Sequence, residues 1–400
     1  MKLLYIADGR SPIALNWIGY FVSAGHEVHL VSTFACSPDL PLASLHILPV
    51  AMSGMREPGG DSEGAAGASR GLRDVIPVNL RTALRRWVGP LTIPGASQKL
   101  RQIIAQIQPD LTHAMRIPFE GMLASQAMES LPGVPLVVSV WGNDFTLHAG
   151  TTPLMRSYTR KTLRRADALH ADCQRDVRLA RQWGFGEEKR AFVLPGGGGI
   201  QLDVFHPRDE SPAQPDFRVI NPRGVRAYIR NDTFFRAVPL VHRQHPQIRF
   251  ICPAMSGESE AEHWLASLYL SEEVELLPRQ SRSQMAKLFR QAQVVVSPSE
   301  HDGTPNTLLE AMACGCFPIV GDIESVREWI KPEVNGLLFD PDNPEELAEA
   351  ILKAFQQPDL QRTARDHNLQ LINERAEHQQ VMRDAEEHYR EIRFTGTGLT

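Results

Sequence analysis

Short apolar runs alternate with helical segments along the chain, and this alternation constrains the fold more than any other feature of the sequence. Residues 3–7 and 28–31 are apolar runs of the length of a buried strand. Between them, residues 14–24 have helical apolar spacing and stop before Gly25, which favours a helix C-terminus. Two strands joined through a helix form a βαβ unit, and repeated units predict a parallel sheet covered on both faces.

The same alternation continues into the C-terminal half. Further strands are expected at residues 44–50, 110–113, 136–140, 168–171, 191–194, 218–221, 248–252, 274–277, 294–297, 317–320 and 336–339. Residues 356–392 are predicted to be helical and heavily charged. Because 400 residues exceed one compact core, the sequence predicts two Rossmann-like α/β domains.

A connector rich in glycine and proline divides the two halves. Residues 194–216 contain four consecutive glycines followed by three prolines, which is typical of a connector. We therefore expect an N-terminal domain over 1–200, a C-terminal domain over 201–375, and a helix and tail over 376–400 that packs back on the N-terminal domain. Residues 52–71, rich in Gly, Ala and Ser, are expected to form a mobile loop.

Composition and charge exclude several classes of protein. The chain is 42% hydrophobic and 22% charged, which excludes a disordered chain, a collagen-like fibre and a coiled coil. A net charge of −5 argues against a nucleic-acid partner. Residues 1–205 hold 21 Lys+Arg and 17 Asp+Glu, whereas residues 206–400 hold 21 and 30. The basic front half and the acidic back half are therefore expected to have different partners.

Cysteine usage and the N-terminus indicate the compartment. The five cysteines include no CxxC pair, which argues against a disulfide framework and a zinc ribbon. The first ten residues hold too short an apolar run for a signal peptide. No stretch approaches the roughly 18 consecutive apolar residues that span a bilayer. A cytoplasmic location is therefore expected.

The clearest chemical signal lies in residues 294–322, where an apolar run, a turn and a helical segment follow one another. The helix is predicted to begin near Pro305, with Thr304 as its N-cap. Helix N-termini bind phosphate through free N–H groups, and Glu310 is placed to accept hydrogen bonds from a ribose diol. The candidate diphosphate-binding residues are Gly303, Thr304, Pro305, Asn306 and Thr307. The first strand is not followed by GxGxxG, which argues against an NAD or FAD site.

The same segment resembles the signature of the family 4 (group 1) retaining glycosyltransferases of the GT-B fold, in which two glutamates are separated by seven residues. Here Asp302 stands in the first position and Glu310 in the second, followed by Ala-Met-Ala and Gly315. The resemblance implies two Rossmann-like parallel-sheet domains facing a central cleft, with Asp302 and Glu310 as catalytic residues. Asp302 departs from the family's glutamate, and the alternative interpretation is that it is only a turn residue.

Further resemblances run along most of the chain, at residues 23–32, 109–114, 140–145, 193–207 and 334–351. The segment 109–114 resembles a strand end that carries two histidines, and here His113 matches only the first, with Arg116 shortly after it. The resemblance implies that His113 or Arg116 contacts the donor sugar; alternatively His113 is a core histidine or the contact is lost. In the segment 140–145, Asn143 and Asp144 are implied to face the interdomain cleft.

Arginines are expected to bind the diphosphate of the donor. The family carries Arg and Lys after the first strand of the second domain, and the corresponding residues here are Arg223, with Arg226 or Arg230 in place of the Lys. A planar guanidinium suits phosphate oxygens, although three solvated arginines are the alternative. Gly9, after the first strand, would allow a close backbone approach to donor or acceptor, and a plain tight turn explains it equally well.

The resemblance implies transfer of a sugar from a nucleotide-diphosphate sugar to an acceptor hydroxyl, with anomeric configuration retained and Arg223 stabilising the leaving group. No dense Asp/His cluster is apparent, and no metal or other cofactor is expected beyond the nucleotide sugar. The acceptor stays open: a glycan, a lipid-linked group or a small molecule. The alternatives are a nucleotide-sugar epimerase of the GT-B fold and a non-catalytic GT-B partner subunit.

Two basic patches lie in the predicted N-terminal domain. The first precedes Trp87 and the second recurs at helical spacing; their members are Arg81, Arg85, Arg86, Arg156, Arg160, Lys161, Arg164 and Arg165. One interpretation is peripheral contact with an anionic membrane, at its inner face. The alternative is a solvated basic surface.

Overall fold

The computed structural model describes residues 1–51, 84–131, 133–208 and 217–396. The expected loop at 52–71 and Arg81 lie outside the described residues. The chain divides into two compact units. The first unit comprises Met1–Asp172, Asp176–Gly197 and Asp384–Thr400, and the second comprises Cys173–Arg175 and Gly198–Arg383. No described helix is long and apolar enough to span a bilayer.

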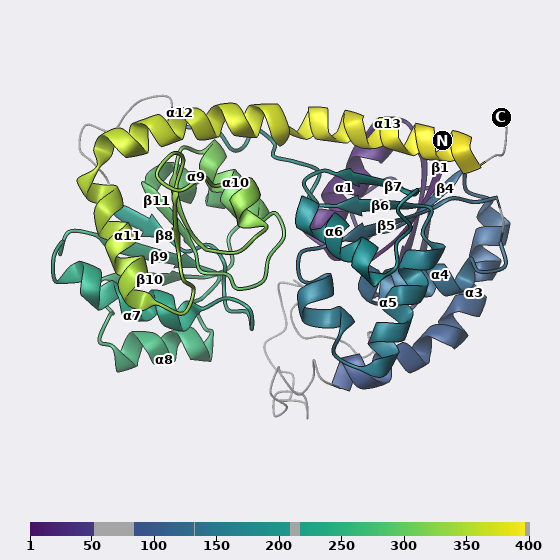
Figure 1. Ribbon diagram of the computed structural model, residues 1–400, viewed down its shortest axis with the longest axis horizontal. Coiled ribbons are helices and arrows are strands. Elements are labelled where there is room, and N and C mark those ends of the chain that lie inside the picture. Colours follow the sequence, from purple (N-terminus) through teal and green to yellow (C-terminus); the bar gives the residue numbers. More distant parts are fainter. Residues whose placement is uncertain (52–83, 132, 209–216, 397–400) are drawn as a thin grey trace. The chain divides into compact units, whose positions relative to one another are not determined.

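The first unit is built on a sheet of seven parallel strands in the order β3-β2-β1-β4-β5-β6-β7 (Figure 1). The strands are β1 (Lys2–Ala7), β2 (Glu27–Ser32), β3 (Ser44–Ile47), β4 (Leu111–Ala114), β5 (Leu136–Val140), β6 (Ala168–Ala171) and β7 (Arg190–Val193). β1, β4, β5 and β6 are almost wholly buried, as expected of parallel strands covered on both faces. Because β2 and β4 lie on opposite sides of β1, the strand order reverses there.

Local sequence explains where several helices of the first unit begin and end. The helices are α1 (Pro12–Ser23), α3 (Ile93–Ile107), α4 (Met122–Ala127), α5 (Pro153–Arg165), α6 (Gln174–Trp183) and α13 (His378–Gly396). The first two residues of α6 and the part of α13 before Asp384 belong to the second unit. Ser11 caps α1 by accepting a hydrogen bond from the Ala14 N–H, and Thr152 caps α5 in the same way. Gly25, with φ of +79°, follows the C-terminus of α1.

The end of α13 is anchored in the core of the first unit. Tyr389 is fully buried, and its hydroxyl accepts a hydrogen bond from Trp17 Nε1 at 3.0 Å. The same hydroxyl is hydrogen-bonded to His113 Nδ1 on β4. The ring of Tyr389 also stacks on Phe21 of α1, with centroids 4.9 Å apart. The last helix is therefore joined to the core of the first unit by both polar and apolar contacts.

The second unit has six parallel strands in the order β10-β9-β8-β11-β12-β13. They are β8 (Arg218–Ile220), β9 (Arg249–Pro253), β10 (Val274–Leu277), β11 (Val294–Ser297), β12 (Phe317–Gly321) and β13 (Leu337–Phe339). The helices are α7 (Asn231–His242), α8 (Ser259–Ser267), α9 (Arg282–Gln291), α10 (Asn306–Ala313), α11 (Pro344–Gln356) and α12 (Pro358–Arg375). The predicted strands are confirmed in both units, with boundaries shifted by a few residues.

The glycine run between the sheets has a steric role that composition alone does not reveal. Gly198 and Gly199 have φ near +77° and +79°. A Cβ on Gly199 would lie 2.6 Å from the carbonyl oxygen of Ala376, where it would clash with the backbone. This close approach allows Ile200 to pair with Glu377 at the start of the last helical segment. The glycine run is thus a connector that also packs closely against the backbone before α13.

The buried hydroxyl of Tyr389 gives a test of how α13 is held. Tyr389→Phe leaves the Trp17 and His113 side chains without their shared partner, and is expected to lower the free energy of unfolding by about 1–3 kcal/mol. Urea unfolding followed by near-UV circular dichroism measures this loss. Tyr269→Phe is the matched control because Tyr269 is 90% exposed. Equal unfolding curves for the two variants would contradict the anchoring role.

Candidate active site

Polar side chains converge in the second unit at the carboxyl ends of β8 and β11. Arg223, three residues after β8, forms an ion pair through Nη2 with Asp302. Its Nη1 donates to Thr307 Oγ1 at 2.9 Å, and its backbone N–H donates to Asn221 Oδ1 at 3.2 Å. The Arg223 side chain is only 6% exposed, so this ion pair is largely shielded from solvent. Three residues predicted for the donor site are therefore in direct contact.

The N-terminus of α10 differs from the prediction in its capping. Thr304 was expected to cap the helix, but its hydroxyl accepts a hydrogen bond from Trp329 Nε1 at 3.0 Å. Pro305 was expected in the first helical position, but it is the N-cap, in an extended conformation with ψ of 111°. Asn306 is thus the first helical residue, and no side chain caps α10. Both details of the prediction were wrong, although a helix does begin at this point in the chain.

Glu310 lies in the second turn of α10, close to the surface but mostly surrounded by protein. Burial raises the pKa of its carboxyl from 4.5 to about 7, while Arg282 acts in the opposite direction. Near neutral pH this carboxyl can both donate and accept a hydrogen bond, which suits a vicinal diol. Within the described residues no hydrogen bond occupies its side chain.

The other two arginines predicted to bind phosphate lie in different environments. Arg230 is ion-paired with Asp232 at 2.9 Å, with Glu300 at 2.7 Å and with Asp342. The carboxylates of Asp232 and Glu300 raise the pKa of Arg230, the Asp232 hydrogen bond contributing most, and together with Asp342 they offset its charge. Arg226 is exposed and donates to the Tyr228 hydroxyl at 3.1 Å. Of the three arginines, the structure brings Arg223 to Asp302 and Thr307.

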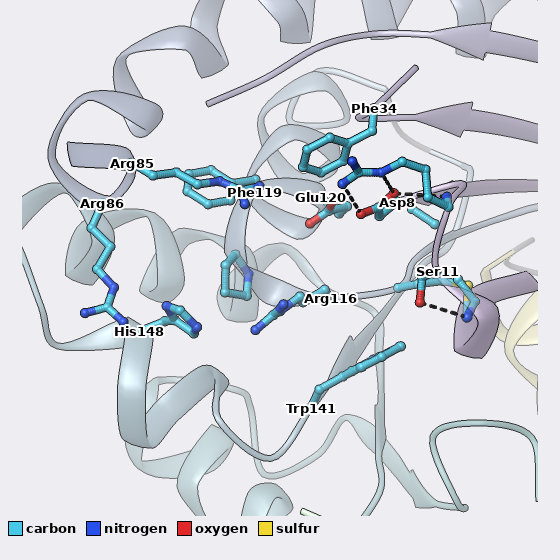
Figure 2. Close-up of a pocket in the computed structure, with 15 residues that line it drawn as sticks. Asp8, Ser11, Phe34, Arg85, Arg86, Arg116, Phe119, Glu120, Trp141 and His148 are labelled. Atoms are coloured by element: carbon cyan, nitrogen blue, oxygen red, sulfur yellow. Dashed lines mark hydrogen bonds and ion pairs between the residues drawn. The ribbon is translucent and has the colours of Figure 1, made fainter. Parts of the chain in front are cut away.

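A second group of predicted residues lies in the first unit, around a cavity of about 330 Å³ at the carboxyl ends of β1, β4 and β5. Figure 2 shows the side chains that point into it. The cavity is lined by Ala7, Asp8, Arg10, Ser11, Ala14, Phe34, Arg85, Arg86, Met115, Arg116, Pro118, Phe119, Glu120, Trp141 and His148. Ligands of open parallel sheets bind at this edge, where the strand order reverses.

Asn143 and Asp144 hold Arg116 in place and do not themselves line the cavity. Arg116 Nε donates to Asp144 Oδ1 and Nη2 donates to Asn143 Oδ1, both at 2.8 Å. The buried Asp144 carboxylate also accepts from the backbone N–H groups of Ile117 and Trp141, each at 3.2 Å. Burial raises the pKa of Asp144 and the nearby Arg116 lowers it. The two residues thus orient the guanidinium that reaches the cavity.

His113 and Gly9 make contacts inside the protein. His113 is fully buried, with Nδ1 bonded to the Tyr389 hydroxyl and Nε2 to Ser139 Oγ at 2.7 Å. Both ring nitrogens of His113 are therefore engaged inside the protein, as in the core-histidine alternative that the sequence left open. Gly9 allows a close approach of a different kind, because an added Cβ would lie 2.4 Å from Cys36 Sγ and 2.9 Å from Ser32 Oγ.

Sequence reasoning missed several residues of this cavity. Arg10 follows β1 and lies over the Phe34 ring, with its guanidinium carbon 3.7 Å from the centroid. Glu120 is buried and accepts a hydrogen bond from Thr33 Oγ1 at 2.7 Å. His148 comes from the segment after β5. The signal that could have found Arg10 is its position directly after a strand end, as for Arg223.

One group of side chains within the described residues has the atom types of a metal site. It consists of Asp172, Cys173 and Asp176, which lie within five positions after β6. It includes none of the residues predicted to bind the donor.

Two family models match consecutive parts of the chain. The model described as "Glycosyl transferase 4-like domain" matches residues 9–197, and "Glycosyl transferases group 1" matches residues 219–369. The chain belongs to the group 1 glycosyltransferases. The predicted family is therefore confirmed, and the second match includes Arg223, Asp302 and Glu310.

Curated relatives agree with this family assignment at low identity. The D-inositol 3-phosphate glycosyltransferase of Mycobacteroides abscessus is 27% identical over 38% of this chain and 37% of its own length. The protein of the same name from Saccharomonospora viridis is 25% identical over 59% of this chain and 61% of its own length. The chain thus spans between about a third and three fifths of these relatives.

Solved structures match the chain over nearly its whole length. Sucrose-phosphate synthase from Thermosynechococcus elongatus has a TM-score of 0.74 and 16% identity, covering 98% of this chain and 99% of that one. Anabaena HepE in complex with UDP has a TM-score of 0.71 and 16% identity, covering 98% and 100%. The predicted GT-B class, with two Rossmann-like parallel-sheet domains, is confirmed.

The raised pKa of Glu310 predicts how stability depends on pH. Because the native state disfavours the ionised carboxyl, stability is lost as pH rises from about 4.5 towards 7, and no further loss follows above that value. Glu310→Gln removes this loss, so wild type is expected to lose roughly 3 kcal/mol relative to the variant across that range.

Thermal unfolding of both proteins from pH 4.5 to 8 measures the difference. Glu349→Gln, an exposed position on α11, is the matched control and is expected to follow wild type at every pH. A constant offset between wild type and Glu310→Gln would contradict the burial of this carboxyl.

Proposed function

We propose that the protein transfers a sugar from a nucleotide-diphosphate sugar to an acceptor hydroxyl, with retention of the anomeric configuration. The observation that carries this proposal is the contact of Arg223 with Asp302 and Thr307, beside the uncapped N-terminus of α10. Membership of the group 1 family supports it. Because HepE was solved with UDP and with UDP-glucose, a uridine diphosphate sugar is the first donor to test.

The donor diphosphate is proposed to bind between Arg223 and the first N–H groups of α10. Gly303 to Thr307 supply the backbone at this point, and the helix start contributes partial positive charge. Negative charge develops on the diphosphate as it leaves, and a guanidinium already held by Asp302 and Thr307 needs little reorganisation to stabilise it. These groups supply the positive charge that a metal ion supplies in other transferases, so the proposed reaction uses none.

Retention is proposed to follow from attack on the face of the sugar that the leaving group occupies. The acceptor oxygen forms a bond to the anomeric carbon as the bond from that carbon to the phosphate oxygen breaks. The departing phosphate oxygen takes the proton of the acceptor hydroxyl. Glu310 is proposed to bind the ribose diol, and Asp302 to orient Arg223 and contact the sugar.

Each domain has a proposed task. We assign donor binding to residues 201–375 and acceptor binding to residues 1–200, while the segment 376–400 secures the N-terminal domain. Arg226 and Arg230 are proposed to lie only at the periphery of the donor site, because carboxylates offset the charge of Arg230. In the N-terminal part, Arg116 is proposed to contact substrate with the support of Asn143 and Asp144.

Arg223→Met tests the donor site. It is expected to lower kcat/KM for release of UDP from UDP-glucose, or from whichever nucleotide sugar is turned over, on the order of 100-fold. A UDP-release assay across a panel of nucleotide sugars measures this loss, and a thermal shift with UDP measures binding. Arg236→Met is the matched control, because Arg236 is an exposed arginine on α7.

The outcome also separates the alternative functions. A change of UDP-sugar into its epimer without acceptor would favour an epimerase and contradict transfer. UDP binding without turnover of any donor, in the presence of acceptor mixtures, would favour a non-catalytic partner subunit. Equal activity of Arg223→Met and Arg236→Met would contradict the proposed donor site.

We further propose that the first unit touches an anionic membrane from the cytoplasmic side. Trp87 and Leu91 are exposed, at 60% and 65%, which is unusual for large apolar side chains. Thr152, the cap of α5, is hydrogen-bonded to the carbonyl of Arg86, which places this segment beside the start of α5. The basic groove of α5 contains Arg156, Arg160, Lys161 and Arg164. Exposed apolar groups next to clustered cations suit an anionic lipid surface.

Sedimentation with phosphatidylglycerol vesicles tests the membrane contact. Wild type is expected to sediment with these vesicles and not with pure phosphatidylcholine, and added salt is expected to weaken binding. The double variant Trp87→Ser with Arg160→Ser is expected to lose most of it. Tyr269→Ser removes another exposed aromatic residue and serves as control. Binding that ignores lipid charge would contradict this proposal.

A further inference from the structure

The cavity of the first unit is unusually rich in guanidinium groups. Arg10, Arg85, Arg86 and Arg116 line it, against only two acidic residues. Both acids are already engaged, because Asp8 is ion-paired with Arg10 at 2.9 Å and Glu120 accepts from Thr33. Burial also raises the pKa of Glu120, which disfavours its charged form. The lining therefore carries an excess of positive charge.

The charges of three of these arginines, Arg85, Arg86 and Arg116, act on the imidazole of His148. In Figure 2, Arg86 and Arg116 extend towards His148, and Arg85 lies along Phe119. Burial lowers the pKa of His148 to about 2, with further contributions from the charges of Arg116, Arg86 and Arg85. The imidazole is thus neutral at physiological pH, so it can sit among the guanidinium groups without adding a fourth charge.

Two buried donors in the lining have no partner in the part of the chain that the structure describes. They are Nε of Arg86 and Nε1 of Trp141. Both atoms can only donate. A buried donor left unpaired destabilises the protein, and a ligand rich in acceptor oxygens can supply the missing partner.

The guanidinium groups are held in position before any ligand arrives. Arg116 is fixed by Asp144 and Asn143. The guanidinium carbon of Arg85 lies 4.7 Å from the centroid of Phe119, in a cation–π contact. Such preorganised forks match the oxygens of a phosphate group better than a flexible lysine would. Phe34, Pro118 and Trp141 add apolar walls next to these donors.

We infer that this cavity binds the acceptor through a phosphate ester, held by Arg85, Arg86 and Arg116. The inference rests on the proposed function, because it identifies the chemical class of the acceptor. The phosphate belongs either to a soluble metabolite or to a lipid headgroup. In both cases the phosphate fixes the acceptor while a hydroxyl elsewhere on the same molecule receives the sugar.

Binding of a simple phosphate ester, glycerol 3-phosphate, tests the cavity directly. Calorimetric titration is carried out on the full chain with saturating UDP, which fills the proposed donor site. Arg86→Gln is expected to weaken glycerol 3-phosphate binding by about 10- to 100-fold, the loss of one charge-assisted hydrogen-bonding group. Arg86→Lys is expected to recover part of the affinity. Lys99→Gln, an exposed position on α3, removes the same charge and is expected to change nothing.

The readouts separate this inference from the proposed donor site. UDP binding is expected to persist in Arg86→Gln, which also shows that the variant is folded, and to be weakened in Arg223→Met. Glycerol 3-phosphate binding is expected to show the reverse pattern. Binding that UDP abolishes, or that Arg86→Gln and Arg86→Lys leave unchanged, overturns the inference. Binding that depends on Arg86 in a protein that binds no nucleotide supports the cavity and contradicts the donor site.

The source of the phosphate is resolved by competition. Vesicles containing phosphatidic acid are expected to displace glycerol 3-phosphate from wild type but to bind Arg86→Gln weakly, if the natural acceptor is a lipid. Displacement by soluble sugar phosphates or inositol phosphates, with no effect of vesicles, assigns a soluble acceptor. Both results support a phosphate site. Failure of every phosphate ester to bind overturns it.

Discussion

The parallel order of the strands determines where chemistry can occur in this protein. All carboxyl ends of a parallel sheet lie along one edge, and the loops diverge where the strand order reverses. In the first unit β1 lies between β2 and β4, and in the second β8 lies between β9 and β11. Arg10 and Arg223 each come three residues after these central strands. A change in strand order would separate each from its partners.

The sequence was sufficient to predict the sheets because their strands are buried on both faces. Such strands appear as continuous apolar runs, as β11 does with Val294 to Ser297, and they need no partner to be recognised. Details that depend on distant residues were not predictable. Threonine is a residue type that favours the N-cap position, yet the Thr304 hydroxyl accepts a hydrogen bond from Trp329, 25 positions later. Only the tertiary packing decides between these two uses of one hydroxyl.

In the candidate site, too, the sequence predicts where a residue lies but not which side chains it contacts. The resemblance to the family's Arg and Lys after the first strand of the second domain pointed to both Arg223 and Arg230. Their environments are opposite, because Arg223 contacts Asp302 and Thr307 whereas Arg230 pairs with three carboxylates. His113 occupies the expected strand end, yet its ring is paired with Tyr389, 276 positions away. Sequence patterns therefore predicted at which edge of the sheet the functional residues lie. They did not reveal which side chains at that edge are already occupied.

The charge that an anion meets at each site depends on the local partners of the arginines and not on the net charge of the unit. The acidic second unit offers an anion one guanidinium, already oriented by a carboxylate and a hydroxyl, together with a helix N-terminus. The first unit instead gathers several guanidinium groups around a neutral imidazole. The proposed donor diphosphate has to leave during the reaction, and the arrangement in the second unit suits it because Asp302 offsets part of the positive charge of Arg223. The inferred acceptor phosphate only anchors its molecule and is not released during the reaction, so the several guanidinium groups in the first unit suit it.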